Sequence, residues 1–239
     1  MDVICESSFI QIILNTLYLT ILYVPILNIL ALVLATLVFG VSRRMGNFYK
    51  SLLFFPNLLC MVVVGFIWKL MYMYDGGLIN QIFNLLGLSV LAQDWLGSPS
   101  LVLASMSLSI IWFATGYYLV IYLAGLTAIP IELYESCDVE GATGMQKFLN
   151  ITIPMLAPSI TINIILSTIG IIACFDLPFV LTNGGPGYMS ETIALQVYHY
   201  AFTNLQQGRS LALSMMLTLF AVTVAFVELK IFRKREDIY

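Results

Sequence analysis

The sequence predicts an all-α membrane protein with about five transmembrane helices, organised as a single domain over residues 1–239. Composition is the first observation: 60% of the residues are hydrophobic, only 10% are charged, and the mean hydropathy is +0.96. A soluble domain usually carries about 25% charged residues. The second observation is that the apolar residues form long continuous runs, which favour membrane-spanning helices over the alternating strands of a barrel.

Five apolar segments follow one another, each long enough to cross the hydrocarbon core of a bilayer. The first holds no charged residue, the second carries Lys69 near its end, and the third is uncharged and rich in aromatic residues. The fourth begins at Pro158, and the fifth ends where a basic cluster starts. The five segments cover residues 10–39, 51–72, 101–126, 158–181 and 210–232.

The basic residues predict the orientation of these segments. Eight of the ten lie in the connections on one side or after the fifth segment, and only Lys69 and Arg209 fall toward the other side. Because lysine and arginine concentrate on the cytoplasmic side, we expect the N-terminus outside and the C-terminus inside. The eight are Arg43, Arg44, Lys50, Lys147, Lys230, Arg233, Lys234 and Arg235.

Two connections then lie outside the membrane. Residues 73–99 contain a turn signal and a short apolar run at 78–86, which predicts a short helix lying at the surface. In the second, LTNGGPG (181–187) cannot continue a helix, and the amphipathic pattern of 191–202 predicts a re-entrant or surface-lying segment. Tyr72, Tyr74 and Trp95 suit the aromatic belt of a membrane interface.

Several site classes are disfavoured by the residues present. Cys5, Cys60, Cys137 and Cys174 are far apart, and His199 is the single histidine, so a zinc or haem site is not expected. We interpret the cysteines as small buried hydrophobic residues. The chain has no basic tract for nucleic acid and no pattern of a cleaved signal peptide.

A polar loop of about 30 residues, 128–157, interrupts the apolar chain between the third and fourth segments. It predicts two short helices, 131–139 and 143–151, around a break at Gly141, with four carboxylates in and beside the first helix. Simple connections usually have about 4–6 residues. The loop is therefore either an extended solvated connector or a cytoplasmic element that fits a groove in a partner, and the apolar residues in its helices favour the second.

The loop resembles the EAA loop of ABC importer permeases. The resemblance rests on YESCDVEGA (134–142), followed by Phe148, Ile151, the pair Ile153-Pro154 and Pro158. The rest of the chain is similar to the maltose-type, sugar-importing branch of that family. The matching residues are LAGLTAIPIELY (123–134), Phe175-Asp176, LTNGGP (181–186), Asn15-Thr16, Pro25 and Ala201-Phe202.

Three features depart from the family pattern. The Glu-Ala-Ala triplet is Glu135-Ser136-Cys137, and the usual aspartate before the glycine is Glu140. Both changes keep size or charge, so docking should survive them. The family also has a membrane helix before the segment that starts here near Phe9, and we interpret this first helix as missing through truncation, a late start or compensation by a partner.

The resemblance implies a non-enzymatic permease subunit of a bacterial cytoplasmic membrane. Its implied partners are a second permease subunit, ATP-binding subunits that hold the ATP, an extracytoplasmic solute-binding protein and the lipid bilayer, with no cofactor in this chain. Glu135 would pair with a basic residue of the ATP-binding subunit, and a side chain at Gly141 should block the elbow. The implied ATPase-coupling residues are Glu135, Ser136, Cys137, Asp138, Glu140, Gly141 and Ala142.

Candidate residues for the solute path are fewer and each has a second interpretation. Phe113 and Tyr117 offer aromatic faces for a sugar, or pack against helices and lipid. Ser167 and Cys174 match solute-site positions of the family, but Ser167 could instead bond across helices. Asp176 is an acidic group near the outer end of the fourth segment, or an interface carboxylate that reaches water. Other solute-site positions are apolar here, which leaves open that selectivity rests with a partner: Ile110, Ala114 and Ile171.

Alternative functions remain open at this point. A permease for a non-sugar solute such as glycerol phosphate would share the loop, although no arginine or lysine lies deep in a segment. A non-transport membrane structural protein would not need the loop. An intramembrane enzyme would need paired polar groups at membrane depth, and no such pair is visible. His199 is expected to be a surface residue that touches the binding protein.

Overall fold

The computed structural model describes residues 7–236, and within this range the regular structure is helical. Short 3₁₀ turns, η1 (Phe55–Leu58) and η2 (Ser89–Leu91), and π turns, η3 (Phe148–Thr152) and η4 (His199–Thr203), connect the α-helices. The α-helices are α1 Ser7–Phe39, α2 Arg43–Phe54, α3 Met61–Met71, α4 Leu78–Leu85, α5 Val102–Ala128, α6 Ile131–Val139, α7 Gly144–Lys147, α8 Ile153–Met155, α9 Ala157–Ile172, α10 Asp176–Leu181, α11 Ile193–Tyr198 and α12 Gln207–Glu236.

The membrane-spanning elements are long helices and bent pairs. In the described part of the chain, α1, α5 and α12 are each long and apolar enough to cross a bilayer alone. Two further spans are possible if the pair α2–η1 and α3, bent by 93°, and the pair α7–α8 and α9, bent by 66°, each count as one. The predicted all-α membrane fold is therefore confirmed, with three straight spans and up to five in total.

The second predicted segment, 51–72, is not one helix. Leu59 and Cys60 are extended, with ψ of 150° and 134°, and they separate η1 from α3. Pro56 does not itself make the break, because Phe55 before it is helical, with φ of −52° and ψ of −44°, and Pro56 lies in the first turn of η1. The expectation of a straight second span was wrong in this respect.

The fourth predicted segment, 158–181, is also divided. Helix α9 ends at Ile172, and the chain turns at Ala173 before α10 starts at Asp176. A continuous helix would place Pro178 in its interior, where the missing N–H removes a hydrogen bond and the ring clashes with the preceding turn. Restarting at Asp176 puts Pro178 in a first turn, where no intrahelical N–H bond is made.

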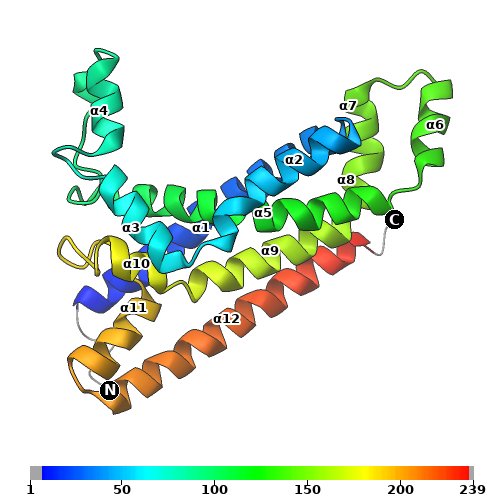
Figure 1. Cartoon of the computed structure of the whole chain (residues 1–239). Helices are drawn as coiled ribbons and strands as arrows, with labels where there is room; N and C mark the ends of the chain where they lie inside the picture. The colour runs from blue at the N-terminus through cyan, green and yellow to red at the C-terminus, as the bar shows by residue number, and fades with distance from the viewer. Residues whose placement is uncertain (1–6, 237–239) are drawn as a thin grey trace.

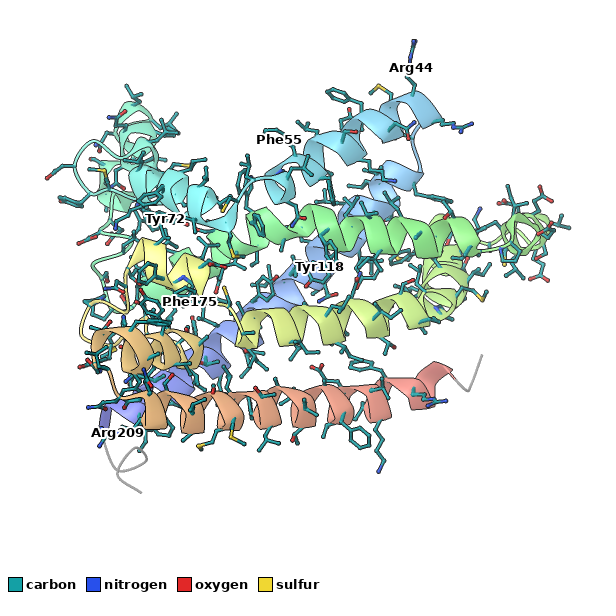
Figure 2. All side chains as sticks on the ribbon, turned by 60° about the horizontal axis from the view of Figure 1, so that its bottom comes forward. Arg44, Phe55, Tyr72, Tyr118, Phe175 and Arg209 are labelled. Atoms are coloured by element: carbon teal, nitrogen blue, oxygen red, sulfur yellow. The ribbon has the colours of Figure 1, made fainter. Side chains whose placement is uncertain are left out.

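Helices α1, α5, α9 and α12 run alongside one another and form the body of the molecule (Figure 1). Helix α1 packs mainly against α5 and α9, and α12 packs against α9. Helices α6 and α7 project from one end of this bundle, where α2 begins and α12 ends, while α4, α10 and α11 lie at the other end. Arg44 and Arg209 mark these opposite ends in Figure 2.

Side-chain hydrogen bonds join three helices inside the bundle. The amide of Asn28 on α1 donates to Ser167 Oγ on α9 at 3.0 Å, and the hydroxyl of Tyr122 on α5 donates to Asn28 Oδ1 at 2.9 Å. Asn163 Nδ2 on α9 donates to the carbonyl of Tyr118 on α5 at 3.1 Å. Bonds of this kind give interhelical contacts a fixed geometry inside lipid.

Candidate functional site

The polar loop forms a helical hairpin at one end of the bundle. Helix α6 runs outward and ends in a Schellman motif, in which the N–H of Ala142 donates to the carbonyl of Cys137 at 3.0 Å. The N–H of Gly141 donates to the carbonyl of Asp138 at 3.1 Å, and Gly141 has φ of +76°. This glycine therefore stops α6 and reverses the chain, as the predicted break at Gly141 requires.

The reason for a glycine at position 141 is conformational. A Cβ added to Gly141 would have no atom within 4 Å in this chain. The expectation that a side chain there blocks the elbow by its bulk is therefore not supported by contacts within the chain. The left-handed φ itself disfavours every residue with a Cβ.

The second arm of the hairpin starts with a capping box. Thr143 Oγ1 accepts from the N–H of Gln146 at 3.4 Å, and Gln146 Oε1 accepts from the N–H of Thr143 at 2.7 Å. This reciprocal pair fixes the start of α7, whose N-cap Thr143 is only two residues after Gly141. The turn between the arms is therefore short and defined by hydrogen bonds on both sides.

Two side-chain contacts brace the arms against each other. Lys147 Nζ lies 2.6 Å from Asp138 Oδ1, and the hydroxyls of Tyr134 and Thr152 are 3.0 Å apart. Sequence reasoning placed Asp138 among the coupling residues but missed its pairing with Lys147 and the contact of Tyr134. The only sequence signal was the presence of a single lysine in an acidic loop, which does not identify its partner.

The outer surface of the hairpin is acidic with an apolar tip. Glu135, Ser136 and Glu140 are exposed, and Val139 is 90% exposed at the tip. Cys137 and Ala142 are half-buried between the arms. Of the predicted coupling residues, the structure thus leaves Glu135 and Glu140 free to meet a partner, and it engages Asp138 within the hairpin.

The hairpin is joined to the membrane bundle at its base. A cleft of about 430 Å³ lies between the second arm and the ends of α1 and α5. Helix α8 leads into α9 through Leu156, which is fully buried at the bend. A displacement of the hairpin therefore acts directly on α9. The cleft is lined by Thr36, Phe39, Leu126, Ile131, Tyr134, Gly144, Lys147, Phe148 and Thr152.

The predicted solute-path residues do not share one surface. Tyr117 is 42% exposed and Phe113 is half-buried on α5, so both reach the outside of this chain. Ser167 is fully buried and bonded to Asn28, and Cys174 is buried after the end of α9. Asp176 is half-exposed and opens α10. A path along this chain's surface would pass Phe113 and Tyr117 without reaching Ser167.

The loop at the far end of the bundle is fastened by residues from three elements. Asn15 Nδ2 on α1 donates to the carbonyls of Tyr188 and Glu191 at 2.8 and 3.0 Å. His199 contacts Glu191 Oε1 through Nδ1 at 2.8 Å and Asn183 Oδ1 through Nε2 at 3.1 Å. Burial raises the pKa of the Glu191 carboxyl, and the contact with His199 acts in the opposite direction. His199 therefore braces the loop from within while remaining partly exposed, and its expected contact with the binding protein stays a prediction.

Helices α11 and η4 form the segment predicted over 191–202. The hydroxyl of Thr16 on α1 accepts from the N–H of Ile193, and Ser210 on α12 donates to the carbonyl of Val197. The segment is thus tied to the first and last spans. No cluster of three metal-ligating side chains occurs anywhere in residues 7–236. Cys174 is buried as expected, but Cys60 is exposed and Cys137 is half-buried, so the interpretation of the cysteines as buried residues is wrong for these two. Cys5 lies outside the described residues.

Comparisons with known proteins identify the family of the chain. Residues 5–235 match the family described as the binding-protein-dependent transport system inner membrane component. SmoG of Agrobacterium fabrum, a sulfoquinovosyl glycerol transport system permease protein, is 32% identical over 225 residues, which cover 93% of this chain and 71% of SmoG. MalF of Thermococcus litoralis, a trehalose/maltose transport system permease protein, is 36% identical over 170 residues, which cover 71% of this chain and 57% of MalF.

The fold agrees with a solved transporter. A chain in the crystal structure of a bacterial alginate ABC transporter, in complex with an alginate pentasaccharide-bound periplasmic protein, superposes with a TM-score of 0.89. The match covers 98% of this chain and 82% of that chain at 21% identity, so it supports the fold alone. The resemblance inferred from the sequence is confirmed by the family match over nearly the whole chain. The chain belongs to the binding-protein-dependent transport system inner membrane components, the membrane permeases of ABC transporters.

Proposed function

We propose that this permease imports a sugar across a bacterial cytoplasmic membrane and is driven by ATP hydrolysis in a separate subunit. The hairpin within residues 128–157 is the docking element for that subunit and faces the cytoplasm. The chain itself binds no ATP in this scheme. A second permease subunit completes the path, and an extracytoplasmic binding protein delivers the solute.

The observation that carries the proposal is the construction of the hairpin. A solvated connector would not need the Schellman stop at Gly141, the capping box at Thr143 and the brace between Asp138 and Lys147. These features give the hairpin a rigid shape, although none of the side chains of α6 is buried. A rigid, exposed and acidic element joined directly to α9 is suited to receive a push from a neighbouring subunit.

The charges gathered at the hairpin end support its cytoplasmic placement. Arg43 and Arg44 open α2 at this end, and Lys147 lies in the hairpin. Arg209 lies at the other end of α12. Under the positive-inside rule this distribution favours a hairpin in the cytoplasm, with α4, α10 and α11 outside.

A sugar is the proposed solute class because the family relatives with printed substrates carry sugars or sugar derivatives. Inside this chain the surface that a sugar could meet is aromatic, with Tyr117 and Phe113 on α5. Ser167 and Cys174 are buried within the chain, so selectivity is proposed to rest largely with the binding protein and the second permease. Lys69 is exposed in the last turn of α3, and its Nζ donates to the carbonyl of Val180 at 3.2 Å, so one of its three donors is used within the chain.

The docking role is tested by charge and backbone changes in the hairpin. In a complex purified in detergent, Glu135→Lys and Gly141→Asp are expected to release the ATP-binding subunit and to abolish ATP-driven uptake in proteoliposomes. Glu135→Lys reverses the exposed charge, and Gly141→Asp places a side chain on a residue with φ of +76°. Retention of the subunit is measured by quantitative gel analysis.

Matched controls separate docking from general damage. Asp75→Lys makes the same charge change on an exposed residue at the opposite end of the bundle. Gly144→Asp adds the same side chain in the first turn of α7, where an acidic residue is favourable. Both controls should keep the subunit and the uptake. If the two hairpin variants also retain the subunit and transport normally, the proposed docking is wrong.

A further inference from the structure

A lobe at the end of the molecule remote from the hairpin displays an unpartnered aliphatic surface. This α4 lobe, residues 73–99, contains α4 and η2. Leu78, Ile82, Leu85 and Leu86 share one side of α4, since they are spaced by four, three and one residues. The exposed fractions of Leu85 and Val90 are 86% and 87%, and the remaining members of the surface are between 46% and 67% exposed. The exposed aliphatic residues of the lobe, which we call the aliphatic surface, are Leu78, Ile82, Leu85, Leu86, Leu88, Val90 and Leu91.

The opposite side of α4 is fixed to the lobe by Asn80. Its Nδ2 donates to the carbonyls of Tyr74 and Gln93 at 3.2 and 3.0 Å. Its Oδ1 accepts from the N–H of Gln93 at 3.3 Å and from Trp95 Nε1 at 2.8 Å. Phe83 stacks on Trp95 with ring centroids 6.2 Å apart. The lobe therefore has a small core of its own, and the aliphatic surface faces away from it.

The charge pattern narrows what can cover this surface. No charged residue occurs from 76 to 93, and the nearest are Asp75 and Asp94 at the two ends of that stretch. Helices that lie in the lipid headgroup region usually carry a cationic face, which α4 lacks. The cores of permanent subunit interfaces, by contrast, are apolar and depleted in charged residues.

The position of the lobe further narrows the kind of partner that can cover the aliphatic surface. Figure 1 shows α4 displaced sideways from the bundle, beyond α3 and at the same end of the molecule as α10 and α11. A binding protein that lands from above and leaves again would expose the aliphatic surface to water in every cycle. Exposed apolar residues gathered in this way mark a contact with another protein or with the membrane, and a neighbour within the membrane plane meets the lobe from the side.

We infer that the aliphatic surface of the α4 lobe packs against the second permease subunit and helps to hold the permease pair together. The inference rests on the proposed function, in which this chain works beside a second permease. It assigns to the lobe a permanent structural contact at the outer end of the pair. Asn80 is then a positioning residue, because it holds α4 in the orientation that presents the surface.

Photo-crosslinking in the purified complex identifies the neighbour. Benzoylphenylalanine is introduced at Leu85 or Val90, and at Asn84 as a control that is exposed on another side of α4. In nanodiscs without binding protein, Leu85 and Val90 are expected to form a product with the second permease, identified by mass spectrometry, and Asn84 is not. Products with lipid only, products that require added binding protein, or no product at all would each overturn the inference.

A second measurement covers variants that assemble poorly. The double variant Leu85→Asp and Val90→Asp should lower the amount of second permease retained in detergent several-fold, while Gln81→Asp and Asn84→Asp should retain it. Unchanged retention in the aliphatic double variant contradicts the inference. If the unaltered chain carries no second permease through purification, the proposed function fails instead, so the two failures are distinguishable.

Discussion

Gly141 and Gly144 are three residues apart in the hairpin, and a Cβ on either would meet open space. They differ in the backbone, because only Gly141 has a positive φ, of 76°. Gly141→Ala is therefore expected to destabilise the turn by about 1–2 kcal/mol and to lower ATP-driven uptake. Gly144→Ala should be neutral or stabilise α7 by about 0.4–1 kcal/mol. Uptake by proteoliposomes and retention of the ATP-binding subunit measure both effects.

Because both changes add one methyl group, comparing the two variants separates the effect of backbone conformation from the effect of side-chain bulk. Equal losses in the two variants would mean that the partner fills the space beside both glycines, and the conformational explanation would then be incomplete. Equal tolerance would mean that the turn at Gly141 is not needed for coupling.

Among individual residues, the sequence predicted those whose role depends only on the backbone conformation of their own short segment. The break at Gly141 and the helix that ends before it follow from glycine chemistry, and the structure has both. Contacts between residues distant in the chain were not predicted. The bond between Asn28 and Ser167, 139 residues apart, depends on how α1 lies against α9, and no local pattern encodes that geometry. The same bond explains why Ser167, a candidate for the solute path, is enclosed.

Among the elements, α5 and the end of α2 approach so closely that their contact depends on a glycine. A Cβ on Gly116 would lie 2.2 Å from the carbonyl oxygen of Leu53 and 2.6 Å from Cα of Phe54, both backbone atoms. Gly116→Ala is therefore expected to push α2 and η1 away from α5, at a cost typical of overpacking, about 1–3 kcal/mol. The melting temperature of the purified complex should fall.

Gly170 on α9 is the matched control for this change. A Cβ there would meet only the hydroxyl of Tyr118, at 3.8 Å, which is ordinary contact. Gly170→Ala should leave the melting temperature unchanged or slightly raised, since alanine favours the helix. Equal melting temperatures for Gly116→Ala and the unaltered complex would show that α2 can shift without cost.

Element boundaries were predicted best for the three segments that each form one long helix. The first, third and fifth predicted segments correspond to α1, α5 and α12. The second and fourth were predicted as single segments because their hydropathy is continuous across Pro56 and Pro178. In both, the apolar character persists while the backbone breaks, so hydropathy alone could not locate the turn. Proline alone could not locate it either, because α1 continues through Pro25 and the second segment breaks at Leu59 and Cys60, after Pro56.

In the whole molecule, one continuous path joins the hairpin to the far end. The second arm of the hairpin leads through the buried Leu156 into α9, which is bonded to α1 and α5 by Ser167 and Asn163. The α10–α11 region is in turn bonded to α1 by Asn15 and Thr16. A force on the hairpin is therefore delivered to helices that are already fastened together, which favours movement of the whole chain over bending inside it.

Rigid movement of this kind has a measurable consequence. Spin labels at Val139, on the hairpin tip, and at Ile162, on the exposed side of α9, report the distance across the 66° bend. We expect the distance distribution, measured by double electron–electron resonance in a cysteine-replaced chain within the complex, to be the same with and without ATP. A second pair, from Val139 to the ATP-binding subunit, confirms that ATP has switched the complex.

The bend is held by the fully buried Leu156 and by the contact of Tyr134 with Thr152, so it has no free hinge. A shift in the first pair when the second pair reports switching would mean that the hairpin swings on α9, and the coupling would then run through α5 instead.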